Sequence, residues 1–307
     1  MSKNVLSRWG VICVEGEEAA QFLHAQLSNS IKDLPENKIR LAAFCNAKGR
    51  MLGTFFVVRK GVQHFLICPS STIPALTKRL SMFILRSKCK ARDASSEWQM
   101  QFVPSVSAVL PTAGPMSAHW ADDTTCTLAL RPHGGVTAGL ALKSSSALGD
   151  AVPSTTEDDQ FDLALHRLGI PFVSIETVEM FIPQAVNFDL IGGVNFEKGC
   201  YPGQEIVARS HYLGKSKRRA FSAVVSSEGA IRAGMDVWME GKTNEPVGNV
   251  VTVAHADGNA HLMVDCGLED AAKPDSQFTL TIDGKALIFK LTNPPYDFTA
   301  KGSQFND

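Results

Sequence analysis

Residues 196–209 read FEKGCYPGQEIVAR, and this stretch decides how the rest of the chain is interpreted. We expect Pro202 at the first position of a helix that runs to the end of the stretch. Cys200 would then lie at the helix entrance with the Lys198 cation close by, and both features favour a thiolate and lower the pKa of the cysteine from about 8.5. Such a thiolate can act as a nucleophile, a redox switch or a soft-metal ligand. A cysteine that is incidental to a turn is the equally open alternative.

The composition is that of an ordinary globular protein. The chain has 307 residues, 44% of them apolar and 20% charged, with a net charge of −1 and a pI near 6.7. This length favours two or three folding units. The charge balance gives no sign of direct nucleic-acid binding. The N-terminus shows no signal or transit pattern, and no apolar run approaches the roughly 18 residues that span a bilayer, so we expect a cytoplasmic protein without a membrane partner.

The seven cysteines are scattered, without a CxxC pair or a Cys/His cluster of zinc-ligand spacing. An odd number of cysteines in a chain without an export signal favours free thiols. Most lie in apolar, strand-like surroundings, where a buried, inert thiol is expected. Cys200 is the exception, and we predict no resident metal site.

Strand-like and helix-like segments mix without a regular alternation, which favours an α+β fold. Strands are expected at 9–14, 53–58 and 62–68, and helices at 17–27 and 71–88. The small, polar residues of 144–159 read as a loop, followed by a helix at 162–170. After Arg219, short alternating segments separated by turns indicate a small antiparallel barrel or sandwich. We place the domain boundary between residues 1–214 and 215–307.

The stretch 181–209, FIPQAVNFDLIGGVNFEKGCYPGQEIVAR, strongly resembles the signature of the YgfZ family. The core pattern K-G-C-Y-x-G-Q-E matches residues 198–205 without a gap. The match continues upstream through 182–184 and downstream through 207–209. Residues 6–9 and 47–50 also look like the family, so that the resemblance covers essentially the whole chain and is weakest at 103–158.

This resemblance implies the fold of the glycine-cleavage T protein, a tetrahydrofolate-dependent aminomethyltransferase. Three lobes, the last a C-terminal antiparallel β-barrel, would form a ring around a folate cavity, with Cys200 near its mouth. The family binds tetrahydrofolate and supports the assembly or repair of iron–sulfur enzymes. These partners include a radical enzyme that thiolates tRNA.

The resemblance also implies that ordinary T-protein chemistry is absent. That pattern has paired aspartates after a Gly-Gly hydrophobic turn, whereas this chain has Gly53 and Thr54 at the matching positions. The carboxylate that positions the folate amine is therefore missing. A folate-dependent one-carbon or demethylating enzyme, the alternative function, would need a replacement carboxylate, and Asp189 and Glu205 are the candidates.

The resemblance assigns roles to individual residues. Cys200 would be the functional thiol, with Lys198 beside it. Trp9 matches an aromatic folate-site position, although a core tryptophan is as well supported by the residue alone. Phe161 falls at a second aromatic position, where it keeps stacking and loses the indole donor of the usual tryptophan. The remaining folate-side candidates are polar or lie in the motif: Gln184, Asn187, Tyr201, Gln204, Glu205 and Arg209. Capping of a local turn is an equally supported role for Gln184 and Asn187.

The run 211–219 is the most basic stretch of the chain. It can meet folate glutamate tails, RNA phosphate or an acidic partner. A solvated connector between domains is the favoured interpretation, because most charge runs are one.

Overall fold

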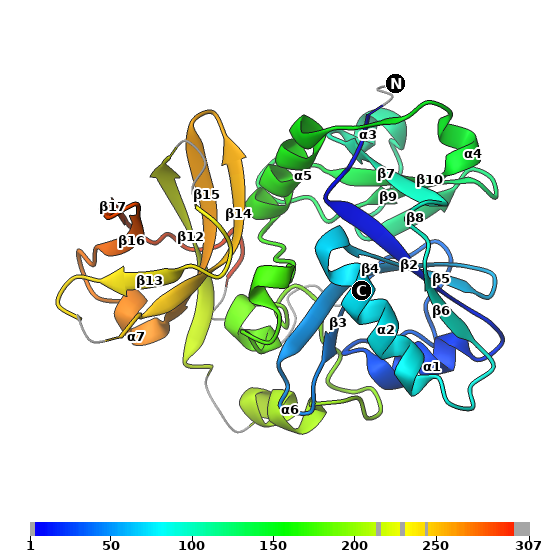
Figure 1. The fold of residues 1–307 in the computed structure, drawn as a ribbon, viewed down its shortest axis with the longest axis horizontal. Helices are drawn as coiled ribbons and strands as arrows, with labels where there is room; N and C mark the ends of the chain where they lie inside the picture. Colours follow the sequence, from blue (N-terminus) through cyan, green and yellow to red (C-terminus); the bar gives the residue numbers. More distant parts are fainter. Residues whose placement is uncertain (1–3, 213–215, 228–230, 243–244, 298–307) are drawn as a thin grey trace.

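The computed structural model describes residues 4–212, 216–227, 231–242 and 245–297, and within them it shows an α+β protein built on three antiparallel sheets (Figure 1). Two sheets and most helices belong to the N-terminal part, and the third sheet lies beside them. The expected domain boundary at 214/215 lies outside the described residues, because residues 213–215 are not among them.

The first sheet has the strand order β3-β4-β5-β2-β6. Its strands are β2 (Trp9–Glu15), β3 (Arg40–Cys45), β4 (Met51–Lys60), β5 (Gln63–Pro69) and β6 (Lys90–Asp93), and its helices are α1 (Ala19–Gln26), η1 (Ser70–Thr72) and α2 (Ile73–Phe83). The strands and helices expected from the sequence in this part are found, with Pro74 in the first turn of α2. The helix expected at 71–88 is shorter, because residues 70–72 form η1 and α2 ends at Phe83.

Both faces of the first sheet are buried, which explains the near-continuous apolar run of β4. Ile12, Phe55 and Leu66 pack on one face against α1 and α2. Phe56 and Phe65 point to the opposite face, into a core shared with the second sheet. Because side chains alternate along a strand, a strand buried on both faces shows no polar alternation.

The second sheet has the order β7-β10-β9-β8. Its elements are β7 (Trp98–Val103), α3 (Val106–Val109), β8 (Ser117–Trp120), β9 (Thr125–Ala129), β10 (Gly139–Ser144) and α4 (Ser145–Leu148); β11 (Val152–Pro153) pairs in parallel with β1 (Asn4–Val5).

The expectation of a loop over 144–159 was wrong. Helix α5 (Thr155–Leu168) begins well before residue 162. Ser154 caps it by accepting a hydrogen bond from Glu157 N, and two acidic residues in the first turn complement the helix dipole. The polar composition of this segment was a helix N-terminus rather than a linker. Gly169, at φ 68°, ends the helix.

Asp158 on α5 holds the segment that precedes β2. Its carboxylate is fully buried and accepts hydrogen bonds from the backbone N–H groups of Ser7 and Arg8 at 3.0 and 3.1 Å. The Ser7 hydroxyl donates to the same carboxylate. These bonds hold the segment before β2, and therefore Trp9, against α5.

The third sheet is a curled antiparallel half-barrel with the order β12-β15-β14-β13-β16-β17. Its strands are β12 (Arg218–Ser226), β13 (Asp236–Met239), β14 (Gly248–Ala256), β15 (Asn259–Gly267), β16 (Phe278–Ile282) and β17 (Lys285–Phe289), with α7 (Leu268–Ala271) after β15. The alternating segments read from the sequence are confirmed as strands. Figure 1 shows β14 facing α5, so the half-barrel lies beside the N-terminal part along this helix.

Candidate functional site

The KGCYPGQE motif forms a loop that is tied to the end of α1. Asn195 N donates to Ser28 O at 3.0 Å, and the Asn195 side chain accepts from the backbone N–H groups of Glu197 and Lys198 at 2.9 and 3.0 Å. Upstream, the Ser28 hydroxyl donates to Gly193 O at 2.6 Å. These hydrogen bonds hold the start of the loop in place and thereby position the motif residues that follow it.

Lys198 is a structural cation in this loop. Its Nζ is buried and donates to the backbone carbonyls of His24 and Leu27, the latter at 2.6 Å, where the C-terminal end of α1 favours positive charge. Nζ also lies 4.9 Å from the centre of the Tyr201 ring. Burial lowers the pKa of Lys198 to about 8, and the neighbouring Cys200 opposes that shift.

The expected helix start at Pro202 was wrong. Helix α6 (Gln204–Tyr212) begins two residues later, because Gly203 takes φ 80°, which a helix cannot accommodate. Cys200 lies four positions before the first helical residue, so it is not at the helix entrance. Its side chain is exposed, whereas five of the other six cysteines are buried and Cys89 is half-buried. The structure thus sets Cys200 apart through exposure.

Gly203 is required by a close approach of two backbones. A Cβ at this position would lie 2.3 Å from Asn46 O and 2.6 Å from Gly49 Cα, in the turn between β3 and β4. We expect Gly203→Ala to lower the free energy of unfolding by about 1–3 kcal/mol, measured by urea denaturation. Gly61→Ala is the control, because Gly61 also has a positive φ but open space around its Cβ. Equal costs at the two positions would contradict the close-approach explanation.

Gln184 and Asn187 serve the packing of neighbouring elements. The Gln184 amide, at the start of η3 (Pro183–Val186), donates to Val207 O in α6 at 2.7 Å. The Asn187 side chain donates to Ala220 O in β12 at 2.8 Å and accepts from Ala220 N at 3.3 Å. Both residues are buried. Their amides therefore link η3 to α6 and to the half-barrel.

The two carboxylates named as possible replacements have other partners. Asp189 is buried and binds the Arg219 guanidinium through contacts of 2.6 and 3.2 Å. Glu205 is exposed on α6 and pairs with Arg209 at 2.8 Å, one helical turn away. Neither is among the residues that line the cavities described for residues 4–212, 216–227, 231–242 and 245–297. Gln204 donates weakly, at 3.3 Å, to Lys198 O within the motif loop.

Gly53 and Thr54 carry no carboxylate and fill core positions. A Cβ at Gly53 would lie 2.6 Å from Leu76 Cδ1 of α2. The Thr54 hydroxyl is buried and accepts from Val173 N at 2.9 Å. An aspartate side chain at either position would meet packed atoms.

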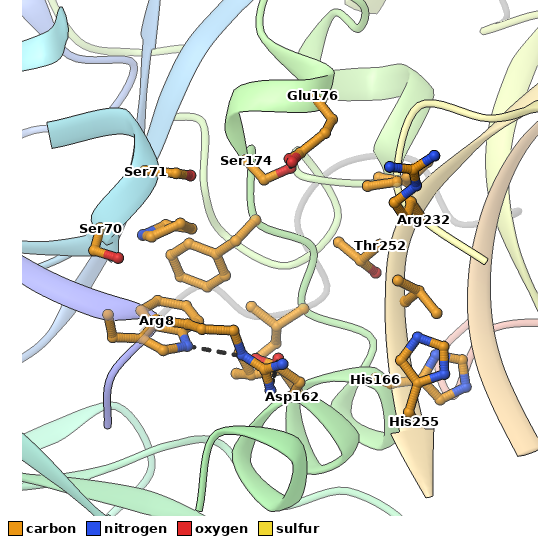
Figure 2. A pocket seen from close by; sticks show the side chains of 18 of the residues that line it. Arg8, Ser70, Ser71, Asp162, His166, Ser174, Glu176, Arg232, Thr252 and His255 are labelled. Carbon is orange, nitrogen blue, oxygen red and sulfur yellow. Dashed lines mark hydrogen bonds and ion pairs between the residues drawn. The ribbon is translucent and has the colours of Figure 1, made fainter. Parts of the chain in front are cut away.

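A cavity of about 400 Å³ lies between the first sheet, α5 and the half-barrel, and Figure 2 shows its lining. Its apolar walls come from Trp9, Leu165, Ile170, Phe172 and Val251. The polar groups stand around these walls: Arg8 and Asp162 on one side, Ser70 and Ser71 on another, and Thr252, His255 and Arg232 from the half-barrel. An apolar pocket with a few convergent polar groups is the usual form of a small-molecule site.

Trp9 lines this cavity and Phe161 supports it from behind. The Trp9 ring packs edge-on against Phe172 at 4.8 Å and against Phe161 at 5.0 Å. Phe161 is fully buried and is not part of the lining. Phe172 supplies the second aromatic surface of the cavity.

Asp162 and Glu176 are the two carboxyl-bearing residues of the described lining, and Asp162 is the one on α5. It lies 2.9 Å from the Arg8 guanidinium, and Trp9 Nε1 donates to it at 3.4 Å (Figure 2). Burial raises its pKa to about 6, against the lowering effects of Arg8 and of the Trp9 hydrogen bond. The group can therefore accept, or when protonated donate, a hydrogen bond near neutral pH.

This raised pKa makes stability depend on pH. Because the folded protein holds the proton more tightly than the unfolded chain, the contribution of Asp162 is fully present below about pH 4 and is lost as the pH rises through about 6. We expect the stability of the native protein to fall relative to Asp162→Asn over this window, by at most about 3 kcal/mol. Urea denaturation of both proteins from pH 4 to 7 measures the difference. A rise over the same window would contradict the assignment.

Two histidines line the cavity on the side of the half-barrel. His166 follows Asp162 by one turn of α5, and His255 lies on β14. The Nδ1 atoms of both are buried and have no hydrogen-bond partner within the described part of the chain. Burial lowers the pKa of His166 to about 4, so its imidazole is neutral at physiological pH.

The structure separates the motif from the cavity. None of residues 196–209 lines the cavity. Cys200, which was expected near the mouth of the cavity, is therefore not among its lining residues. Of the residues proposed to contact folate, Trp9 alone borders it. Sequence reasoning missed Arg8, Asp162, His166, Arg232 and His255. The i, i+4 spacing of Asp162 and His166 was a usable signal, whereas the half-barrel residues carried none.

The basic run 211–219 is more than a solvated connector. His211 stacks on Phe196 with ring centroids 3.7 Å apart. Arg218 pairs with Asp265 and Arg219 with Asp189, so the two arginines neutralise buried carboxylates. Residues 213–215 of the run lie outside the described part.

Among the described residues, no group of three or more His, Cys, Asp or Glu side chains is placed to hold a metal ion. No helix in the described part of the chain is long and apolar enough to cross a membrane.

The fold is that of the glycine-cleavage T proteins. The aminomethyltransferase T of the glycine cleavage system from Bartonella henselae superposes with a TM-score of 0.70 over 98% of this chain and 87% of its own, at 16% identity. No protein-family model matches the sequence.

Curated proteins are also similar to this chain in sequence. The chain is 28% identical over 232 residues to the tRNA-modifying protein YgfZ of Colwellia psychrerythraea, covering 70% of this chain and 69% of that protein. It is 27% identical over 297 residues to the YgfZ protein of Klebsiella pneumoniae, covering 92% and 89%. The mitochondrial iron–sulfur cluster assembly factor IBA57 homolog of Mycosarcoma maydis is 29% identical over 228 residues, covering 68% and 54%. These relatives confirm the resemblance to YgfZ proteins that residues 181–209 indicate.

Proposed function

We propose that this protein is a YgfZ-type factor that binds tetrahydrofolate in the central cavity and supports the assembly or repair of iron–sulfur enzymes. Through a tRNA-thiolating radical enzyme it would serve tRNA modification in the cytoplasm. The names of the curated relatives support the link to tRNA modification and iron–sulfur assembly. Cys200 is the functional thiol of this proposal.

The observation that carries the proposal is the exposure of Cys200 in a loop whose other residues are held in place. All seven cysteines lie within the described residues, and only Cys200 is exposed. Lys198 and Tyr201 on either side are buried. A reactive thiol must be accessible to a partner or a ligand, and this arrangement presents one sulfur atom at a defined place.

The residues of the cavity fit a reduced folate. Trp9 and Phe172 offer aromatic surfaces for a pterin ring. The Asp162 carboxyl group can pair with the N–H donors of a 2-amino-4-oxopyrimidine edge. Arg232, on the half-barrel side of the cavity and away from Asp162, can meet the carboxylates of the glutamate tail (Figure 2). A volume of about 400 Å³ is within the usual range for small-molecule sites.

Titration of tetrahydrofolate into the full chain by calorimetry tests the folate site. We expect Trp9→Leu to weaken binding by about tenfold, because it removes an aromatic wall and the Nε1 donor to Asp162. Trp98→Leu is the matched control, since Trp98 packs against Phe65 outside the cavity. Equal losses in both variants, or no binding by the native protein, would overturn the assignment.

A folate-dependent one-carbon or demethylating enzyme remains the second candidate, and Asp162 is the observation that favours it. The carboxylate absent at Gly53 and Thr54 is found instead on α5, inside the cavity. Asp162 replaces Asp189 and Glu205 in this hypothesis. Turnover of tetrahydrofolate with glycine-derived or N-methyl substrates, abolished by Asp162→Asn, would support it; absence of turnover by the native protein would dismiss it.

A further inference from the structure

A second cavity, of about 490 Å³, lies between the last turns of α6, η3 and the start of the half-barrel. We call it the basic cleft. Its polar lining consists mainly of Arg50, Ser210, Lys217, Arg218, Asn249 and Asp265. It shares no lining residue with the folate cavity.

The basic cleft has an excess of positive charge. It contains three cationic side chains and one carboxylate, that of Asp265, although the whole chain carries a net charge of −1. The Arg218 guanidinium contacts that carboxylate at 2.8–3.1 Å and also donates to Val247 O. The carboxylate is thereby neutralised by one arginine, and two positive charges, those of Arg50 and Lys217, remain.

These two cations differ in how they are held. The Arg50 guanidinium donates to the backbone carbonyls of Glu179 and Met180, which fixes it against the wall of the cleft. Lys217 is exposed, and its ammonium forms no ion pair or hydrogen bond with a described residue. One charge is thus preorganised and the other is free to close on a ligand, an arrangement that lowers the entropy cost of binding.

The remaining lining also favours an anion. The Ser210 hydroxyl adds a hydrogen-bond donor to the lining. The Asn249 amide already donates to Asp236 Oδ1 at 2.8 Å, which leaves one of its two N–H groups. Ser210 lies in the last turn of α6, where the helix C-terminus contributes a partial charge of about −0.5. This partial charge is small against the two uncompensated cations, so the cleft stays positive.

We propose that the basic cleft binds a small phosphate-bearing molecule, held by Arg50 and Lys217 between α6 and the half-barrel. Charge-assisted hydrogen bonds from an arginine and a lysine are the usual means of holding phosphate oxygens. The site is separate from the folate cavity, so the proposal does not rest on folate binding. Its ligand would bridge the helix that follows the Cys200 loop to β12 and β14.

Calorimetric titration of pyrophosphate and inorganic phosphate into the full chain at low salt tests the site. We expect pyrophosphate to bind and Lys217→Gln to weaken it by about fivefold or more, with Arg50→Gln weakening it further. Lys285→Gln on β17 is the matched control, since Lys285 is an exposed lysine outside the cleft. Thermal unfolding checks that the Arg50 variant is folded, and Lys217→Gln decides the result if it is not.

Several outcomes would overturn the proposal. Pyrophosphate binding that is absent, or that is equally strong in Lys217→Gln and Lys285→Gln, excludes a phosphate site in the cleft. Tighter binding of tri-γ-glutamate than of pyrophosphate, with the same loss in Lys217→Gln, would assign the cleft to a folate tail. Binding of a tRNA without binding of either phosphate probe would assign it to nucleic acid.

Tetrahydrofolate binding that is unchanged in Lys217→Gln would support the separation of the two sites.

Discussion

A Cys200→Ser variant is expected to fold normally, to match the native protein in the proposed binding of tetrahydrofolate, and to lose the proposed ability to restore the activity of iron–sulfur enzymes. We expect a loss of about tenfold or more, because a thiolate is a soft ligand and a strong nucleophile and a hydroxyl is neither. Its stability should stay within about 0.5 kcal/mol of the native value, since the side chain is exposed. The measurement is complementation of a strain lacking the protein, with the activity of a tRNA-thiolating enzyme as readout.

Cys89→Ser is the matched control for this experiment. Cys89 is the other cysteine that is not fully buried, and it precedes β6, far in sequence from the motif. It should complement fully. Full complementation by Cys200→Ser would remove the thiol from the proposed function, and it would leave the folate site to be judged by the Trp9→Leu titration.

An Asp189→Ala variant is expected to lose about 3–5 kcal/mol of unfolding free energy. The change leaves the Arg219 guanidinium, which is 11% exposed, without the carboxylate that it contacts at 2.6 Å. Arg219 also donates to Gln184 O at 2.9 Å. If the unpaired guanidinium moves out toward water, this contact between η3 and β12 is lost as well. Urea denaturation measures the loss.

Glu205→Ala is the control for Asp189→Ala, because it removes an acidic residue from an exposed ion pair. The side chains of Glu205 and Arg209 are 80% and 63% exposed, and such pairs contribute about 0.5 kcal/mol or less. The double variant Asp189→Ala/Arg219→Ala should recover part of the loss. A cost below about 1 kcal/mol for Asp189→Ala would show that the pair is not a structural element.

The order of strands and helices was largely predictable, because local rules decide it. Alternating segments after Arg219 formed the half-barrel, and the apolar spacing of residues 73–83 formed α2. Local rules failed where two of them competed. The acidic, serine-rich stretch before α5 fits a loop as well as a capped helix start, and Pro202 is placed outside α6 by the positive φ of Gly203.

The candidate site was predictable only in part. The sequence pattern indicated an unusual cysteine, and the structure shows it as the exposed one. Amide residues such as Gln184 and Asn187 look alike in sequence whether they bind a ligand or a neighbouring strand. Their partners, Val207 and Ala220, lie 23 and 33 positions away and become neighbours only in the folded chain.

By itself the sequence determined the α+β class, the strands of the half-barrel and the identity of the motif that carries Cys200, because composition, periodicity and motif spacing are local properties. The tertiary structure alone decided which polar groups meet. It placed Asp162 of α5 opposite His255 of β14 in one cavity, and Arg50 near Lys217 in another. It also placed FEKGCYPGQEIVAR outside the cavity that Trp9 lines, against the end of α1. Burial and charge pairing depend on contacts between distant segments, and these exist only after the sheets have packed.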